Sequence, residues 1–516
     1  MTAYAHTESD FERDLIDKLR TGEINLTNPG NDLDFNQVHR SKLWDYRPDI
    51  KTTAQLEENF KQILERNNQD RLDGPLTPGE FKQVMDQINA LSTPYKAGRF
   101  LYGMNGVSQV EVDLENGKHE YLTVFDQSQI GAGNTVYQVV NQIERPAVVP
   151  GNKDRRFDVT LLINGLPIYQ IELKKDTVGI DEALNQIQQY VQERQFTGIF
   201  STVQIFMAMS PIGTKYMAAT TADAFNKDFA FMWKDEKNRN VRDWEYIADH
   251  MLTIPAAHLL STSYMILDGT DGKECIKVMR PYQVAATRKS LEALKNTDFD
   301  QKLNKDGYIW HTTGSGKTIT SYKTATLANR IPKIDKVVFL VDRKSLTRQT
   351  LDSYRAYDPE HSSEDRQEYT SIRNTENTTD LGRQLKKKGN DIIITSHQKL
   401  KRLIKRDNFK APDKNILFIV DEAHRSTGTE AFGEIQKAFP HSAWIGYSGT
   451  PNFDEKQKGN RTVDVFGKLL HAYTIVDAIS DHNVLGFKVE FNTTVTDEAK
   501  EQQLISYYHE MYPKWT

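Results

Sequence analysis

Thr313-Gly314-Ser315-Gly316-Lys317-Thr318 is the stretch that decides the fold of the second half of this chain. Glycines in such a turn let backbone N–H groups approach a polyphosphate, and the lysine and threonine side chains complete the cradle. Further along, an apolar run ends in Val420-Asp421-Glu422-Ala423-His424. Two carboxylates after a buried strand suit magnesium and water chemistry. The two stretches together predict a site that hydrolyses a nucleoside triphosphate.

The side chains of this predicted site have separate roles. Lys317 is expected to reach the β- and γ-phosphates, and the Thr318 hydroxyl is expected to hold magnesium. Asp421 suits magnesium coordination, whereas Glu422 suits polarisation of the attacking water. We expect His424 to relay between this site and Ser448-Gly449-Thr450-Pro451, which follows another apolar strand. The first position of the phosphate-binding template is His311, where the template has glycine.

Several short apolar strands recur before helical segments in this half of the chain. Such alternation is typical of βαβ units and a parallel sheet. By contrast, residues 361–380 are polar, and we expect a surface loop or an exposed helix there. The predicted strands are 307–310, 336–341, 391–395, 416–420 and 443–447.

The composition is that of a globular protein. The 516 residues are 38% hydrophobic and 27% charged. No apolar run reaches about 18 residues and no signal peptide opens the chain, so neither a membrane span nor export is expected. The single cysteine, Cys275, excludes an intramolecular disulfide and a cysteine-ligated metal framework, which favours a cytoplasmic location. The formal net charge of −5 means that any nucleic-acid surface must be local.

A second candidate site lies upstream, in a β-hairpin predicted around the turn Asn164-Gly165. Side chains alternate along a strand, so Glu172 and Lys174 point to one side. A plain two-residue turn pairs Asp158 with Ile171, which puts Asp158 on the face opposite Glu172. We therefore expect an odd loop or a β-bulge, which brings Asp158, Glu172 and Lys174 to one face.

These side chains are suited to metal-dependent cleavage of a phosphodiester. Asp158 and Glu172 can hold a hard divalent cation, and Lys174 can orient or deprotonate a water. Gln186 and Tyr190 are four residues apart on the next predicted helix and so share a face. The alternative for a short Glu-x-Lys motif is a solvated charged strand.

The first predicted helix offers two further acidic residues. Glu12 is a candidate for an additional carboxylate near the metal, and Glu8 competes with it. Phe11, Leu15, Ile16 and Leu19 give this segment helical spacing, so a plain amphipathic helix is the alternative.

The upstream Asp…Glu-x-Lys arrangement, followed by Gln-x-x-x-Tyr, resembles the PD-(D/E)xK nucleases. Residues 280–491 resemble the first RecA-like lobe of superfamily 2 helicases and translocases. In that resemblance Gln283 of Arg280-Pro281-Tyr282-Gln283 reads adenine, which implies ATP with Mg²⁺ as the cofactors. The resemblance to these helicases also places residues 339–343 and 394–397 where that family contacts a nucleic-acid backbone. The alternative is that these residues only pack at the ends of their strands.

A nuclease of this kind before a DEAH-type lobe resembles the restriction (motor) subunit of type I restriction–modification enzymes. The resemblance implies an α/β fold, with a restriction-endonuclease-like nuclease domain at 1–265 and a RecA-like P-loop lobe at 266–491. Residues 492–516 are then a linker or the start of a further domain. It implies ATP-driven translocation of double-stranded DNA, with methyltransferase and specificity subunits as partners. Because such motors need a second lobe, we expect an N-terminal fragment that binds ATP but turns it over poorly.

Two other interpretations stay open. One is a nuclease–helicase of a type III restriction system or another defence or repair system. The other is a non-catalytic assembly module in which ATP only orders the chain. Basic clusters at 386–388, 399–402 and 405–406 can neutralise DNA phosphates, although a charge run is more often a solvated face.

Overall fold

The computed structural model describes residues 7–21, 43–104, 106–235, 237–300, 303–341, 344–359, 372–389, 391–425, 430–457 and 459–483, with 502 and 506. The chain divides into two units, Met1–Thr474 and Ile475–Thr516. Helix α15 (Ile475–Ser480) belongs to the second unit, and the helices and strands before it belong to the first.

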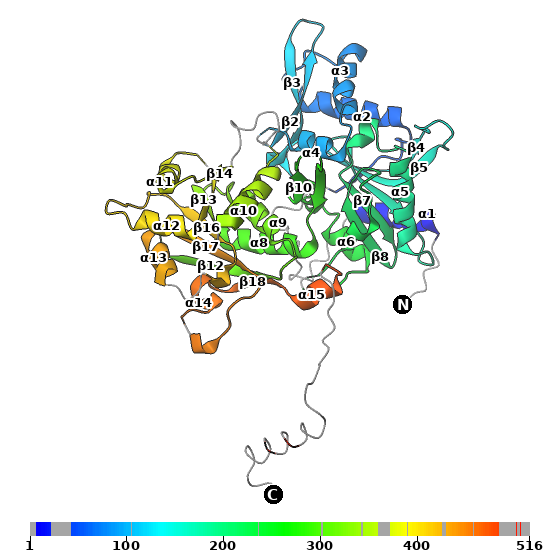
Figure 1. The fold of residues 1–516 in the computed structure, drawn as a ribbon. Helices are drawn as coiled ribbons and strands as arrows, with labels where there is room; N and C mark the ends of the chain where they lie inside the picture. The colour runs from blue at the N-terminus through cyan, green and yellow to red at the C-terminus, as the bar shows by residue number, and fades with distance from the viewer. Residues whose placement is uncertain are drawn as a thin grey trace. The chain divides into compact units, whose positions relative to one another are not determined.

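A mixed seven-stranded sheet forms the core of the N-terminal half (Figure 1). Its order is β1-β4-β5-β6-β7-β8-β9. The β1–β4 and β6–β7 pairs are parallel and the others antiparallel. The strands are β1 (Asp45–Tyr46), β4 (Tyr137–Arg145), β5 (Arg155–Ile163), β6 (Leu166–Leu173), β7 (Ile205–Ser210), β8 (Gly213–Ala218) and β9 (Phe231–Met232).

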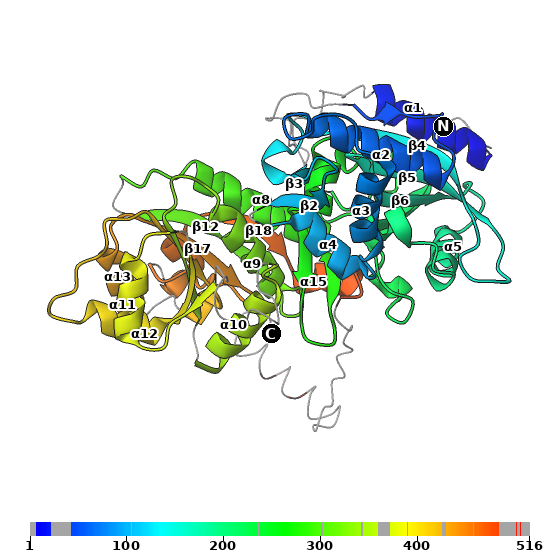
Figure 2. The ribbon, with the colours of Figure 1, turned by 90° about the horizontal axis from the view of Figure 1, so that it is seen from above.

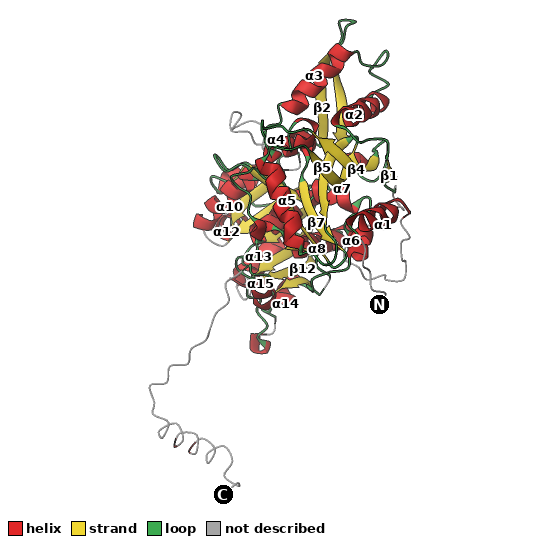
Figure 3. Cartoon of the chain, turned by 90° about the vertical axis from the view of Figure 1, so that its right-hand side faces the viewer, coloured by secondary structure: helices red, strands yellow, loops and turns green. Residues whose placement is uncertain are grey.

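Helices and two small hairpins surround this sheet. Helix α5 packs on β6, β7 and β8, whereas α1 contacts β1, β6 and α6. Figure 3 shows α3 beside β2, which pairs with β3 in a separate two-stranded sheet. The elements are α1 (Glu8–Thr21), α2 (Thr53–Asn67), α3 (Pro78–Asn89), α4 (Pro94–Tyr102), β2 (Val107–Asp113), β3 (His119–Asp126), α5 (Ile180–Gln192), α6 (Trp244–His250), α7 (Ala256–Ser261), β10 (Met265–Asp268) and β11 (Cys275–Val278).

The C-terminal half contains a second seven-stranded sheet, in the order β14-β15-β13-β16-β17-β12-β18. All of its pairs are parallel. Strand β16 reads Ile-Leu-Phe-Ile-Val and is buried throughout, as expected of a strand covered on both faces. The strands are β12 (Asn304–His311), β13 (Lys336–Val341), β14 (Ile372–Asn374), β15 (Ile392–Ser396), β16 (Ile416–Val420), β17 (Ser442–Ser448) and β18 (Leu469–Tyr473).

Helices connect these parallel strands, as βαβ units require. Helix α12 packs against both α11 and α13, and Figure 2 shows these three helices together. The helices are α8 (Pro281–Lys295), α9 (Lys317–Ala328), α10 (Lys344–Ala356), α11 (Thr378–Lys386), α12 (His397–Ile404), α13 (Glu430–Ala438) and α14 (Thr462–Phe466). Short 3₁₀ turns are η2 (Gln127–Gln129), η3 (Gly198–Thr202), η4 (Lys227–Phe229), η5 (Ala423–Arg425) and η6 (Glu455–Gln457).

The parallel sheet and its five predicted strands are confirmed, but two edge strands were not predicted. β14 lies within 361–380, where a loop or an exposed helix was expected. That expectation is wrong at Ile372, which is 1% exposed, because one buried residue in a polar stretch gives no periodic pattern. Residues 360–371 lie outside the described residues.

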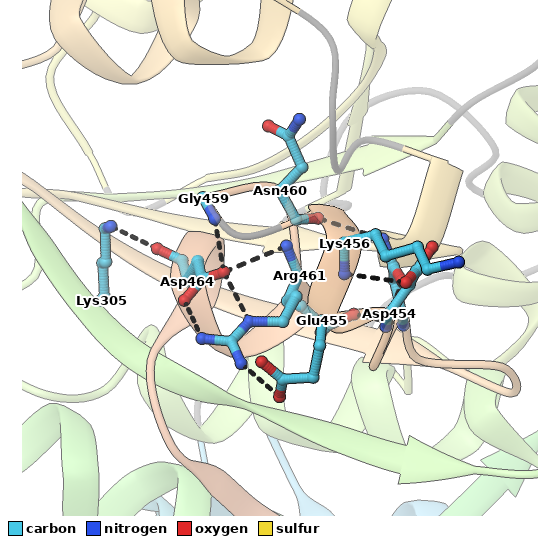
Figure 4. Close-up of polar contacts among 10 residues, drawn as sticks. Lys305, Asp454, Glu455, Lys456, Gly459, Asn460, Arg461 and Asp464 are labelled. Carbon is cyan, nitrogen blue, oxygen red and sulfur yellow. Dashed lines mark hydrogen bonds and ion pairs between the residues drawn. The ribbon is translucent and has the colours of Figure 1, made fainter.

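An ion-pair cluster organises the segment between β17 and α14 (Figure 4). Arg461 donates from Nε and Nη2 to the two carboxylate oxygens of Asp464, at 2.8 and 2.9 Å, and from Nη1 to Glu455 at 2.7 Å. The Arg461 guanidinium holds the pKa of Asp464 well below its usual range. Because the cluster is close to solvent, its main effect is to order this loop, with little contribution to stability.

Candidate nuclease and nucleotide sites

The β5–β6 hairpin contains the irregularity on which the nuclease hypothesis depends. Asn164-Gly165 forms a two-residue turn in which both residues have positive φ. Leu162 pairs with Pro167, but Leu161 pairs with Tyr169, so one residue of β6 has no partner on β5. This is a β-bulge, and it shifts the register of every later pair by one residue. The expected bulge is confirmed, alongside a two-residue turn.

Beyond the bulge the two acidic residues come together. Val159 pairs with Ile171, which places Asp158 beside Glu172. Oδ2 of Asp158 accepts a hydrogen bond from the backbone N–H of Leu173 at 2.9 Å. Glu172 is fully buried. Burial raises the pKa of Glu172 well above its usual value, and the nearby charge of Asp158 raises it further.

Glu172 is fixed by two glutamines. Gln170 donates from Nε2 to its Oε1 at 2.9 Å, and Gln186 donates from Nε2 to its Oε2 at 2.8 Å. Gln186 also donates to the hydroxyl of Tyr190, as their shared helical face predicted. Gln170 was not predicted, although it lies two residues before Glu172 on the same strand face. The period-two pattern was therefore the signal that could have identified it.

The other candidates lie around this pair. Nζ of Lys174, just after β6, donates to the carbonyl of Leu173 at 2.8 Å and lies 3.6 Å from Oε1 of Glu8. Glu12 is buried and accepts a hydrogen bond from Nδ2 of Asn141 at 2.6 Å. Burial raises the pKa of Glu12, with a further contribution from Asp158. Helix α1 therefore brings both of its acidic candidates to the site.

The acidic pair is chemically suited to a divalent cation. Within the described ranges, no group of three or more His, Cys, Asp or Glu side chains is arranged to hold a metal ion. Asp158 and Glu172 nevertheless offer two carboxylates as metal ligands, and their like charges repel each other at a buried position. The charge of Lys174 opposes this effect on the pKa of Glu172, but its contribution is minor. A hard cation would offset this repulsion.

The phosphate-binding turn runs from β12 into α9. Gly314 and Gly316 have φ of 83° and 80°, the left-handed region that favours glycine. A Cβ on Gly316 would lie 2.6 Å from Nε2 of Gln283. Ser315 Oγ donates to a backbone carbonyl within the turn, and Thr313 is exposed at its outer side. Exposed Thr318 and partly buried Lys317 then open the helix.

The acidic strand end faces this turn. Nζ of Lys317 lies 4.0 Å from Oε1 of Glu422. Asp421 accepts a hydrogen bond from the N–H of Glu422 at 3.0 Å. Burial, and then the charge of Glu422, raises the pKa of Asp421 to about 6. His424 links the two motifs as expected, because its Nδ1 lies 2.9 Å from Oγ of Ser448 and 3.4 Å from Oε2 of Glu422.

Gln283 lies beside the phosphate-binding turn. Its Oε1 accepts a hydrogen bond from the N–H of Arg280 at 3.0 Å, and its Nε2 donates to the carbonyl of Ser315 at 3.1 Å. The hydroxyl of Tyr282 reaches the same carbonyl at 2.7 Å. Tyr282 was not predicted as a site residue, because an apolar-bodied residue at a helix start gives no functional signal.

The remaining expectations concern His311 and the two loops. His311 is buried, with Nε2 3.2 Å from Nδ1 of His471, and burial lowers its pKa well below the usual value. It therefore replaces the template glycine as a neutral core side chain. Asp342 and Arg343 lie outside the described residues. In the other loop Thr395 and Ser396 are buried, which fits strand-end packing.

The two sheets and the polar side chains at their strand ends define a protein that joins a nuclease-like α/β domain to a P-loop ATPase lobe. Residues 8–225 match the family model described as Type I restriction enzyme R protein N terminus, and residues 282–514 match that of SWI2/SNF2 ATPase. The chain belongs to the family of type I restriction enzyme endonuclease (R) subunits. The type I resemblance is thereby confirmed over the type III alternative.

Individual relatives are also described as type I restriction enzyme endonuclease subunits. The Type I restriction enzyme SsaAORF53P endonuclease subunit of Staphylococcus saprophyticus is 34% identical over 453 residues, 86% of this chain and 45% of the relative. A Mycoplasma pneumoniae protein, described as the C-terminal part of the putative type I restriction enzyme MpnIIP endonuclease, is 36% identical over 217 residues, 40% of this chain and 99% of that protein. This chain thus spans about half the length of the longer curated relatives that it matches.

Among the solved structures that are similar in part is a restriction-modification enzyme. It is a nuclease-deletion mutant of the Type ISP restriction-modification enzyme LlaGI in complex with a DNA substrate mimic. It matches with a TM-score of 0.29 and 17% identity, over 46% of this chain and 23% of that one.

No helix among the described residues is long and apolar enough to span a membrane.

Proposed function

We propose that this chain is the nuclease and motor part of an ATP-dependent restriction endonuclease that acts on double-stranded DNA. Its partners are methyltransferase and specificity subunits, and its parts are a nuclease domain at 1–265, a motor lobe at 266–491 and a linker or further domain at 492–516. We place the protein in the cytoplasm, because its single cysteine favours a reducing compartment. The observation that carries the proposal is the buried carboxylate of Glu172 beside Asp158, with Lys174 at the end of the same strand.

The nuclease chemistry follows from these contacts. Asp158 and Glu172 would hold a magnesium ion, which when bound supplies Lewis-acid stabilisation of the phosphodiester and a more acidic water. Gln170 and Gln186 keep the Glu172 carboxylate in one orientation. The Lys174 ammonium, held by a backbone carbonyl at the strand end, is placed to orient the attacking water.

The ATPase chemistry uses the P-loop and the strand end facing it. Lys317 binds the β- and γ-phosphates, while Thr318 and Asp421 would hold magnesium. Glu422 lies within 4.0 Å of Lys317 and polarises the attacking water. His424, between Glu422 and Ser448, connects this water site to the C-terminal end of β17. Gln283 confers the preference for adenine.

A basic groove between α11 and α12 supports contact with duplex DNA. It has a volume of about 330 Å³, and Arg383, Lys386, Arg406 and Lys410 are among its lining residues. Arg383 pairs with Asp380 at 2.7 Å. We propose that the groove neutralises backbone phosphates, so DNA affinity should fall steeply with salt.

Cleavage of plasmid DNA in Mg²⁺, together with Mn²⁺ titration by calorimetry, tests the nuclease site. Asp158→Ala should lose both metal binding and cleavage, whereas Lys174→Ala should lose cleavage alone. Lys175→Ala is the matched control, because Lys175 is exposed next to the site. Metal binding and cleavage that persist in Asp158→Ala would contradict the assignment and favour the non-catalytic assembly module.

A fluorescent ATP analogue tests the second site independently. Lys317→Ala should abolish its binding, and Asp158→Ala should leave the binding unchanged. Lys333→Ala is the control, because Lys333 donates to the carbonyls of Lys295 and Thr297, away from the P-loop. Equal binding by Lys317→Ala and the unchanged chain would rule out the proposed phosphate site.

A further inference from the structure

A large cavity lies away from both proposed sites. It has a volume of about 830 Å³, within the usual range for small-molecule sites. Its walls come from α4, from residues around β10 and from α9. Neither the acidic pair of the nuclease site nor the P-loop lines it. The cavity therefore has no role in the chemistry described above.

Lys323 of α9 is the unusual residue of this cavity. It is 8% exposed, and no ion pair or side-chain hydrogen bond joins its ammonium to any described residue. Burial, and then the charge of Arg330, lowers the pKa of Lys323 to about 7. No carboxylate opposes these effects, although Asp126 and Asp358 also line the cavity. A buried ammonium without a partner is costly, and a bound anion would reduce that cost.

Arg330 supplies a second positive charge, and its described partners are neutral. Its guanidinium donates to Oε1 of Gln127 at 2.8 Å and to the hydroxyl of Tyr102 at 3.0 Å. These two acceptors orient the group, and no ion pair joins it to a carboxylate among the described residues. Asp126 is engaged elsewhere, because its Oδ1 accepts a hydrogen bond from the hydroxyl of Ser128 at 2.7 Å.

The remaining walls are partly polar, with Gln204 and Thr326 among their residues, and partly aromatic and apolar. Tyr102 and Tyr357 line the cavity together with Leu101 and Met265. Such walls suit the planar, weakly polar part of a ligand, whereas the two cations suit its anionic part. The volume is large enough for both parts at once.

We propose that this cavity binds a small phosphorylated molecule of nucleotide size, with its phosphate on Lys323 and Arg330. The inference is independent of the proposed nuclease and ATPase activities. Lys323 lies on the same helix as Lys317, the lysine of the phosphate-binding turn. A ligand in the cavity would therefore contact the helix that begins at the proposed ATP site.

Calorimetric titration with inorganic pyrophosphate and with AMP tests this site. The 516-residue chain carries Lys317→Ala throughout, so that the P-loop does not contribute. Both probes should bind this background with one site per chain. Adding Lys323→Met should weaken binding at least tenfold, and adding Lys323→Arg should retain it. Lys295→Met, which removes an exposed lysine at the end of α8, is the control and should change nothing.

Thermal unfolding separates lost binding from lost folding. Lys323→Met removes a buried charge with little change in side-chain length, so its melting temperature should equal or exceed that of the background. Equal affinity with and without Lys323→Met, or no binding of either probe to the background, overturns the proposal. Binding of a single-stranded oligonucleotide but of neither small probe also overturns it, because the occupant would then be a polynucleotide.

Discussion

Nε2 of Gln186 lies 2.8 Å from Oε2 of Glu172 and donates a hydrogen bond to it. The bond joins helix α5 to strand β6 and fixes a carboxylate that has no exposed surface. Since Gln170 holds the other oxygen, Glu172 cannot rotate without breaking a buried hydrogen bond. The orientation of this proposed metal ligand thus depends on two amides that do not themselves react.

Gln186→Ala should therefore weaken metal binding while leaving the fold intact. Loss of a group that orients a metal ligand typically costs about 10–100-fold in affinity or activity. Gln188→Ala is the control, because Gln188 is two residues further along α5 and is not one of the groups that hold Glu172. Mn²⁺ titration and plasmid cleavage measure the effect. Equal losses in both variants would point to a general disturbance of α5.

The sequence predicted the bulge and the approach of the two candidate carboxylates, because a period-two pattern conflicts with a plain Asn-Gly turn. Only a register shift could put Asp158 and Glu172 on one face while keeping the hairpin's apolar residues together. The position of the bulge was not predictable, since any of several residues between Leu166 and Glu172 could have been the extra one.

Other features depend on contacts between distant segments. The burial of Glu172 results from packing of α5 and β7 on β6. Glu12 reaches the site because Asn141, on the second strand of the sheet, holds its carboxylate. A strand pattern indicates which face a side chain occupies, but it does not indicate what covers that face. The cavity around Lys323 was likewise beyond prediction, because α4 and α9 are far apart in the sequence.

Gly165→Ala should destabilise the fold. Gly165 has φ of 80°, and a Cβ there would lie 2.8 Å from the backbone Cα of Phe60. The backbone strain and the clash together should lower the free energy of unfolding by about 2–4 kcal/mol. Gly74→Ala is the control, since an added Cβ meets nothing within 4 Å. Urea unfolding measures both variants, and equal stabilities would contradict the described turn.

Gln283→Ala should reduce ATP affinity by about tenfold or more, and should reduce the preference for ATP over GTP, if the amide reads adenine. Tyr282→Phe is the informative control, because it removes a hydrogen bond to the same Ser315 carbonyl without removing the amide. It should leave the preference intact. Competition between ATP and GTP for a fluorescent analogue measures both quantities. A lost preference in Tyr282→Phe alone would assign the role to the tyrosine.

Asp421→Asn should stabilise the nucleotide-free chain at neutral pH. Burial and Glu422 raise the pKa of Asp421 to about 6, so ionisation costs more in the folded state than in the unfolded state. A shift of about two units corresponds to about 2.7 kcal/mol, and partial exposure reduces the expected gain to about 1–2 kcal/mol. The gain is complete above pH 6 and disappears as the pH falls towards 4, where Asp421 is protonated in the folded state. Urea unfolding at pH 7 and 4.5 measures it, with exposed Asp413→Asn as the control. A gain that increases on acidification would contradict the raised pKa.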